Sequence, residues 1–177
     1  MKKIILIAAC FVSINLIAQE RLNPVLKSFG SLADVPFAKV KADSSLEYKI
    51  VVEFKQKIDD AKDLHPYLEH IGRMYNMHIY DKVPQNKLHV VVVIFGPASY
   101  SVLNNEAYRA IYKKDNPNLE AFKEFRKAGV KVLVCGQSVA IHNIDPKSIS
   151  PDVEIASSRF TAVSTCQMNG YALFQMN

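Results

Sequence analysis

The sequence predicts an α/β protein, a three-layer α/β/α sandwich around a mainly parallel sheet. Two stretches, Leu88 to Phe95 and Val130 to Val134, are almost continuously apolar and rich in valine, which is typical of parallel strands covered on both faces. Segments with helical spacing alternate with the strand-like stretches, and this alternation favours right-handed crossovers between parallel strands. The chain has 177 residues, 49% of them hydrophobic, which suits a single domain with a substantial core.

The first part of the chain, residues 1–18, has the pattern of a secretory signal peptide. A basic start is followed by the apolar run Ile4 to Ile17 and by Ala18, after which the sequence becomes polar. The run is short for a membrane span. We therefore expect cleavage after Ala18, a periplasmic or secreted mature protein, and no stable membrane insertion after cleavage. A lipoprotein anchor at Cys10 is the less favoured alternative, because too little apolar sequence precedes that residue.

Residues 19–45 are predicted to form an irregular segment that wraps the domain or a neighbouring subunit. The segment holds two prolines and a polar run, but residues such as Leu26 and Phe29 make it too apolar for a free tail. The α/β domain is then expected to span residues 46–177.

The first half of that domain opens with a strand, Tyr48 to Phe54, rich in β-branched and aromatic residues. Apolar residues from Leu64 to Tyr75 then recur at helical spacing, with Pro66 tolerated in the first turn. The strand Leu88 to Phe95 follows and ends at a glycine-proline turn.

Two helices are expected next, with Asn104 or Asn105 as the N-cap of the first and Asn118 as the N-cap of the second. Gly129 closes the second helix and leads to the valine-rich strand. The last elements are a short strand, a helix capped by a serine, and a final strand. They are placed at Val153 to Ala156, Ser158 to Met168 and Tyr171 to Met176.

Cys135, at the end of the strand Val130 to Val134, is the sharpest chemical signal. Gly136 permits a sharp turn there, and Ser138 is a candidate cap for a following helix. Ligands of open α/β sheets bind at this edge, and free N–H groups at a helix start favour a thiolate. From these residues alone, an inert buried cysteine is the competing interpretation. The candidate pocket around the thiol comprises Gly96, Gly136, Gln137 and Ser138.

Several other chemistries have little support. Removal of the signal peptide takes away two lysines and lowers the net charge from +5 to +3, and the remaining basic residues are scattered, so nucleic-acid binding is not expected. His65 and His70 are poorly spaced for one helix face, and neither a metal nor a cofactor is expected. His142 lies seven residues after Cys135, and a lone histidine in such a polar turn is more often solvated than catalytic. A disulfide between Cys135 and Cys166 is a less favoured alternative.

A resemblance to a known family extends over nearly the whole mature chain. The segments that carry it are Gly129 to Ser138, Pro151 to Ala156, Thr161 to Gln167 and Gly170 to Leu173, and it extends to Phe29-Gly30, Asp34 to Pro36 and Leu103 to Tyr108. In these segments the chain resembles the DsrE/DsrF-like family, and in particular an exported branch of it. The resemblance implies a five-stranded sheet, a trimer or hexamer, and a cysteine that carries sulfur as a persulfide. By motif position that catalytic cysteine is Cys135.

Two positions depart from the family pattern. Exported relatives often carry His-Gly after the second strand, whereas this chain has Phe95-Gly96, and Cys166 stands where the pattern has another residue. Two hypotheses follow. The first is an exported sulfur-handling protein in which Cys135 exchanges sulfur with a donor or acceptor protein. The second is a non-catalytic oligomeric binding module of the same fold.

Overall fold

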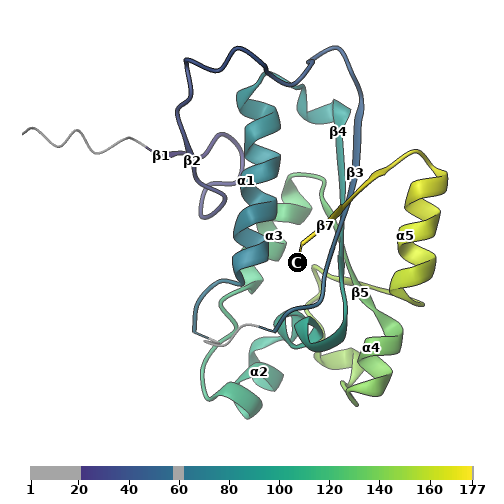
Figure 1. Cartoon of the computed structure of the whole chain (residues 1–177). Helices are drawn as coiled ribbons and strands as arrows, with labels where there is room; N and C mark the ends of the chain where they lie inside the picture. Colours follow the sequence, from purple (N-terminus) through teal and green to yellow (C-terminus); the bar gives the residue numbers. More distant parts are fainter. Residues whose placement is uncertain (1–20, 58–61, 177) are drawn as a thin grey trace, which may run out of the picture.

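The computed structural model describes residues 21–57 and 62–176, and the predicted signal peptide lies outside this range (Figure 1). It confirms the three-layer α/β/α architecture. Five strands form one sheet in the order β6-β5-β4-β3-β7, and every neighbouring pair is parallel. The strands are β3 (Tyr48–Phe54), β4 (Leu88–Ile94), β5 (Lys131–Cys135), β6 (Glu154–Ala156) and β7 (Ala172–Gln175).

The helices lie on both sides of this sheet (Figure 1). They are α1 (Pro66–Tyr80), α2 (Asn105–Tyr112), α3 (Leu119–Lys127), α4 (Gly136–Ile141) and α5 (Arg159–Met168). The structure also contains three short 3-10 segments, Gln85–Lys87, Gly96–Val102 and Pro146–Ser148. Among the residues that the structure describes, no helix is both long enough and apolar enough to cross a membrane.

Strand alternation divides the core into two clusters. Ile50 and Val52 of β3 belong to the larger cluster, which also contains buried residues of α1 and α3. Val51 of β3 points the opposite way and packs with Val163 of α5 in a much smaller cluster. Because successive side chains of a strand point to opposite faces, an unbroken valine run supplies both clusters. The core between the sheet and α5 is therefore the smaller of the two.

The segment before β3 packs on the domain of its own chain. Leu26 and Phe29 are buried, and the Phe29 ring meets Phe125 of α3 edge-on with ring centroids 4.9 Å apart. The buried amide of Asn76 in α1 accepts from the backbone N–H of Leu26 and donates to the Leu26 and Gly30 carbonyls. The segment is also less irregular than expected, since β1 (Arg21–Leu22) and β2 (Leu32–Ala33) form an antiparallel pair.

Asn104, Asn118 and Ser158 occupy the N-cap positions predicted for them, and two of the three make the side-chain hydrogen bond. Asn104 accepts from the Ala107 N–H at the start of α2, and Ser158 accepts from the Thr161 N–H at the start of α5. Asn118 is the N-cap residue of α3, as predicted, but its side chain makes no cap hydrogen bond. Its side-chain carbonyl oxygen accepts the buried N–H of His65 instead. A buried N–H cannot bond water, so the His65 N–H needs a protein partner more than an N–H at the start of α3 does.

Gly30 provides a test of how the N-terminal segment is fixed to α1. It has φ +70°, and an added Cβ would lie 2.3 Å from the backbone carbon of Gly72. Gly170 has φ +84° and nothing within 4 Å of such a Cβ. Gly30→Ala should lower the free energy of unfolding by about 3 kcal/mol, from left-handed strain plus overpacking, and Gly170→Ala by about 1 kcal/mol, from strain alone. Urea denaturation measures both values. Equal losses would show that the segment does not pack closely on α1.

Candidate functional site

Cys135 is the last residue of β5, and α4 begins at the next residue, Gly136. The cysteine is buried, with only 4% of its surface exposed. It lies at the carboxyl edge of the parallel sheet, on the face covered by α5, because the backbone N–H of Arg159 donates to Sγ at 3.2 Å. The sheet edge that the sequence predicted for this residue is therefore the edge that it occupies.

Several hydrogen-bond donors surround the Cys135 sulfur. Burial raises the pKa of the thiol, but hydrogen bonds from the Ser138 hydroxyl and from the backbone N–H groups of Ser138, Arg159 and Gln137 lower it. The lowering effects prevail, so the pKa of Cys135 lies below that of an ordinary thiol. Hydrogen bonds to sulfur stabilise the thiolate, which is the nucleophilic form of cysteine.

Ser138 connects Cys135 to the end of β4. We expected its hydroxyl to cap a helix, but α4 already begins at Gly136 and Ser138 lies inside it, so that prediction was wrong. The hydroxyl oxygen accepts the backbone N–H of Gly96 at 2.8 Å, and the hydroxyl proton is directed to the cysteine sulfur. Gly96 and Ser138 are thus brought together with Cys135.

The other two residues of the candidate pocket act through the backbone. Gln137 is exposed and offers its N–H to the sulfur. Gly136 lies against β6, where an added Cβ would come within 2.7 Å of the carbonyl oxygen of Ala156. The glycine therefore permits the close contact between the start of α4 and the neighbouring strand.

The sequence analysis missed a polar cluster at the same edge. Nη1 of Arg159 donates to both carboxylate oxygens of Glu53, at 3.1 and 2.9 Å, and Nε2 of Gln175 donates to the same carboxylate at 2.8 Å. The Arg159 guanidinium also lies between two aromatic rings, 4.3 Å from the centroid of Phe95 and 4.4 Å from that of Phe160. One available signal was Glu53 itself, a carboxylate in the buried part of β3, between Val52 and Phe54.

A small pocket of about 200 Å³ opens next to this cluster. Its lining includes both charged partners, Glu53 and Arg159, together with Lys55 and Phe95. Cys135 is not among the lining residues, and Arg159 is the residue that touches both the pocket and the thiol. The space available to a small ligand is therefore beside the sulfur.

The second cysteine lies far from the first. Arg159 at the start of α5 contacts Cys135, whereas Cys166 lies two helical turns further on, near Lys131 at the opposite end of β5. Two turns span about 10 Å, too far for a disulfide without backbone movement. Both thiols are free, which contradicts the alternative of a bridge. Burial raises the pKa of Cys166, so the two thiols differ in reactivity.

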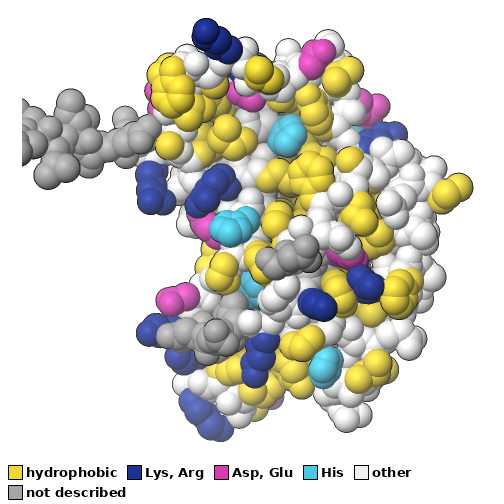
Figure 2. Space-filling view, viewed as in Figure 1, with side chains coloured by type: hydrophobic (Ala, Val, Ile, Leu, Met, Phe, Trp, Pro, Cys, Tyr) yellow, Lys and Arg dark blue, Asp and Glu magenta, His cyan; other side chains and the backbone are white. Residues whose placement is uncertain are grey.

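Other candidate groups do not join this site. The His142 ring packs on Tyr100, with centroids 5.4 Å apart. No cluster of three or more potential metal ligands occurs within residues 21–57 and 62–176. On the face shown in Figure 2, lysine and arginine side chains are scattered among apolar and uncharged ones, without a continuous basic stripe over the coloured residues.

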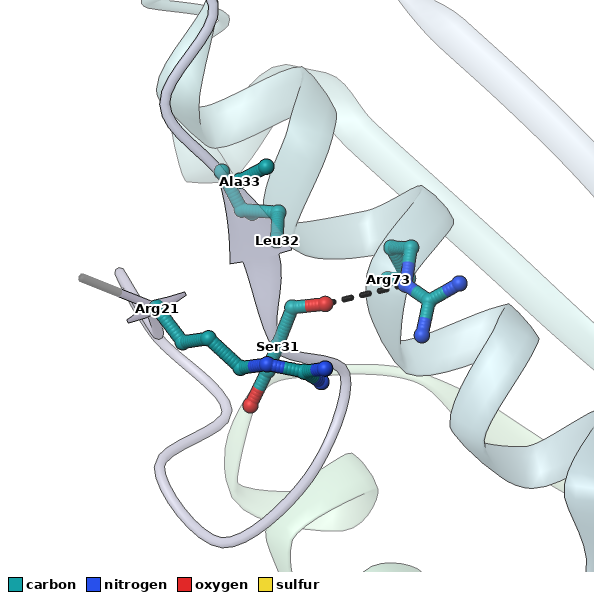
Figure 3. Close-up of a pocket in the computed structure, with 5 residues that line it drawn as sticks. All are labelled: Arg21, Ser31, Leu32, Ala33 and Arg73. Carbon is teal, nitrogen blue, oxygen red and sulfur yellow. Dashed lines mark hydrogen bonds between the residues drawn. The ribbon is translucent and has the colours of Figure 1, made fainter. Parts of the chain in front are cut away.

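A larger groove, of about 430 Å³, lies on the α1 side of the molecule (Figure 3). Arg21, Ser31 and Arg73 are among the residues that line it, and Nε of Arg73 donates to the Ser31 carbonyl at 2.9 Å. Nothing in this groove belongs to the cysteine site, because α1 and α5 cover opposite faces of the sheet.

Comparison with known proteins matches residues 50–176 to the model of the DsrE/DsrF-like family. The chain belongs to this family. Members of the DsrE/DsrF-like family generally take part in sulfur relay and are known to form oligomers.

Two solved structures share the DsrE/DsrF-like fold. A protein of unknown function, MTH1491 from Methanobacterium thermoautotrophicum, superposes with a TM-score of 0.53 at 16% identity, over 73% of this chain and 99% of its own. The YchN protein from E. coli gives a TM-score of 0.51 at 13% identity, with the same coverage of the two chains. At these identities the likeness shows the fold alone. Comparison with curated proteins found no match.

The hydroxyl of Ser138 should control the acidity of Cys135. Ser138→Ala removes a hydrogen bond that favours the thiolate, so the pKa of Cys135 should rise and alkylation at pH 7 should slow about three- to tenfold. The measurement is the rate of iodoacetamide labelling against pH in a Cys166→Ser background. Ser99→Ala is the matched control, because this buried hydroxyl has no hydrogen-bond partner among the described residues. Superimposable pH profiles for all three proteins would rule out the Ser138 contact.

Proposed function

We propose that this DsrE/DsrF-like protein is an exported sulfur-relay protein that carries or transfers sulfane sulfur on Cys135. The observation that carries the proposal is the set of donors around the sulfur: three backbone N–H groups and one hydroxyl favour the thiolate. Family membership supports the same chemistry. No cofactor is needed, because the thiolate alone is the nucleophile.

The reaction has two balanced halves. In the first, the Cys135 thiolate attacks the outer sulfur of a persulfide or polysulfide donor. A bond forms between Sγ and that sulfur, while the bond from that sulfur to the donor breaks and the donor leaves with the electron pair as a thiolate. In the second half, an acceptor thiolate attacks the outer sulfur of the Cys135 persulfide, and the Cys135 thiolate is the leaving group. A separate oxidant is not required in either half.

The hydrogen-bond donors have a role in both halves of this reaction. They raise the fraction of Cys135 that is thiolate near neutral pH, and the same contacts stabilise the sulfur when it leaves as a thiolate. Loading should therefore accelerate as pH rises through the lowered thiol pKa and then level off. Because Cys135 is only 4% exposed, exchange also requires the edge between α4 and α5 to open.

That burial is also the observation that favours a second candidate function. A thiol enclosed by α4, α5 and the strand ends suits a binding module in which Cys135 only supports the edge. In that case the neighbouring 200 Å³ pocket would hold a small ligand or a partner side chain.

Intact mass after exposure to polysulfide separates the two candidates. Wild type and Cys166→Ser should each gain about 32 Da, a gain that a reductant removes, whereas Cys135→Ser should gain nothing at this site. Cys166→Ser is the matched control, since its remaining thiol is the one with the lowered pKa. An unchanged mass in Cys166→Ser, together with no alkylation of the folded protein, would exclude the carrier and favour the binding module.

The same proposal includes export and assembly. The basic and apolar start of the chain supports cleavage after Ala18, and family membership supports a homo-oligomer, a trimer or hexamer. Native mass spectrometry of protein expressed with its leader should show three or six subunits, each beginning at Gln19. Subunits that keep residues 1–18 would contradict export by a cleaved signal, lipid on Cys10 would favour the lipoprotein alternative, and a monomer would contradict the assembly.

A further inference from the structure

The backbone of Arg159 contacts the thiol at the end of β5, and its side chain contacts the end of β3. Its N–H donates to Cys135 Sγ at 3.2 Å, and its guanidinium donates to the Glu53 carboxylate of β3 at 2.9 Å. In the sheet, β4 lies between β3 and β5. One residue therefore bridges two strands that are not neighbours, across the end of the strand between them.

The strand register explains why this bridge is possible. Glu53 pairs with Val93, and Val93 pairs with Leu133, so these three residues share the α5 face of the sheet. Phe95 and Cys135 each follow two positions later and point to the same face. Arg159, the first residue of α5, thus passes over the Phe95 ring on its way to Glu53.

The side chain of Arg159 is held from three directions. Glu53, with a side chain only 6% exposed, accepts from Nη1, and the rings of Phe95 and Phe160 lie against the guanidinium. Gln175 donates to the Glu53 carboxylate and fixes it in turn. A buried ion pair contributes little net stability compared with apolar residues, because both charges lose their hydration. A charge pair between a carboxylate in the buried part of β3 and a guanidinium on α5 therefore fits a role in positioning better than one in stability.

We propose that Arg159 is a positioning residue whose side chain, held by Glu53, Phe95 and Phe160, fixes the first N–H of α5 against the Cys135 sulfur. The inference deepens the proposed function, since that N–H is one of the donors to the sulfur in both halves of the transfer. It also gives Phe95 a role at the position where the family resemblance places a histidine. The ring supports a cation there and exchanges no proton.

Few other charged groups lie on the elements packed against Cys135. Lys55, at the end of β3, is exposed. On β6, Glu154 pairs with Lys131, which lies at the far end of β5. His142 follows α4 and packs on Tyr100. Glu53 and Arg159 are therefore the charged pair whose substitution should alter the pKa of the thiol.

Glu53→Gln separates positioning from simple charge, because the two predict opposite signs. If only charge mattered, removal of a nearby negative charge would favour the thiolate and lower the thiol pKa. If Glu53 positions Arg159, its loss frees the guanidinium, loosens the N–H contact and raises the thiol pKa. We expect the second result, with alkylation of Cys135 at pH 7 slowed about threefold in a Cys166→Ser background. Glu154→Gln is the matched control and should leave the rate unchanged.

A second variant keeps the test decisive if Glu53→Gln folds poorly. Phe95→Leu keeps an apolar side chain but removes the ring face, and it should slow alkylation in the same direction. In the parent protein, the amide proton resonance of Arg159 should follow the titration of the thiol, and this response should weaken in both variants. A faster or unchanged alkylation rate in a folded variant, or an Arg159 resonance that ignores the titration in the parent, overturns the inference.

The test of the positioning role does not depend on whether the protein transfers sulfur. The thiol pKa is read by alkylation, so a protein that shows the expected slowing but never gains sulfur contradicts the proposed function and leaves the positioning role intact. A protein that gains sulfur normally while Glu53→Gln alkylates at the parent rate contradicts the positioning role and leaves the proposed function intact.

Discussion

All five strands of the sheet run in the same direction, and this constraint places every important polar group at one edge. Parallel strands deliver their last residues to the same side, so Glu53 near the end of β3, Phe95 just after β4 and Cys135 at the end of β5 meet at one edge of the sheet. The strands themselves are apolar on both faces and offer no polar chemistry except near their ends. The sheet edge is therefore where backbone N–H groups, a thiol and a carboxylate can meet.

The cysteine at this edge combines burial with hydrogen bonding, and the two have opposite effects on its ionisation. Burial alone raises the pKa of a thiol, as it does for Cys166 towards the other end of α5. At Cys135 the short turn through Gly136 directs N–H groups at the sulfur, while α5 brings another from the opposite direction. The two thiols differ in pKa because hydrogen-bond donors are directed at the sulfur of Cys135, whereas burial dominates at Cys166.

Phe95 stands where the family resemblance predicts a histidine, and its ring has a structural role. The Arg159 guanidinium lies over the Phe95 ring, 4.3 Å from its centroid, and is also paired with Glu53. An aromatic ring cannot exchange protons, but it can stabilise a cation near its face. In the proposed mechanism, ionisation of Cys135 depends on hydrogen-bond donors and needs no neighbouring base.

The sequence alone determined the layer order, the five strands of the main sheet, most of the helices and the cysteine at the strand end, because apolar periodicity, glycines and helix caps are local signals. It could not determine which distant side chains meet. The pairing of Glu53 with Arg159, 106 residues later, depends on strand order and register, which only the folded sheet specifies. Ser138 shows the same limit, because its hydroxyl could cap a helix or bond a loop. The tertiary structure brings the N–H of Gly96 to within 2.8 Å of the Ser138 hydroxyl oxygen, so the hydroxyl bonds the loop after β4 and caps no helix.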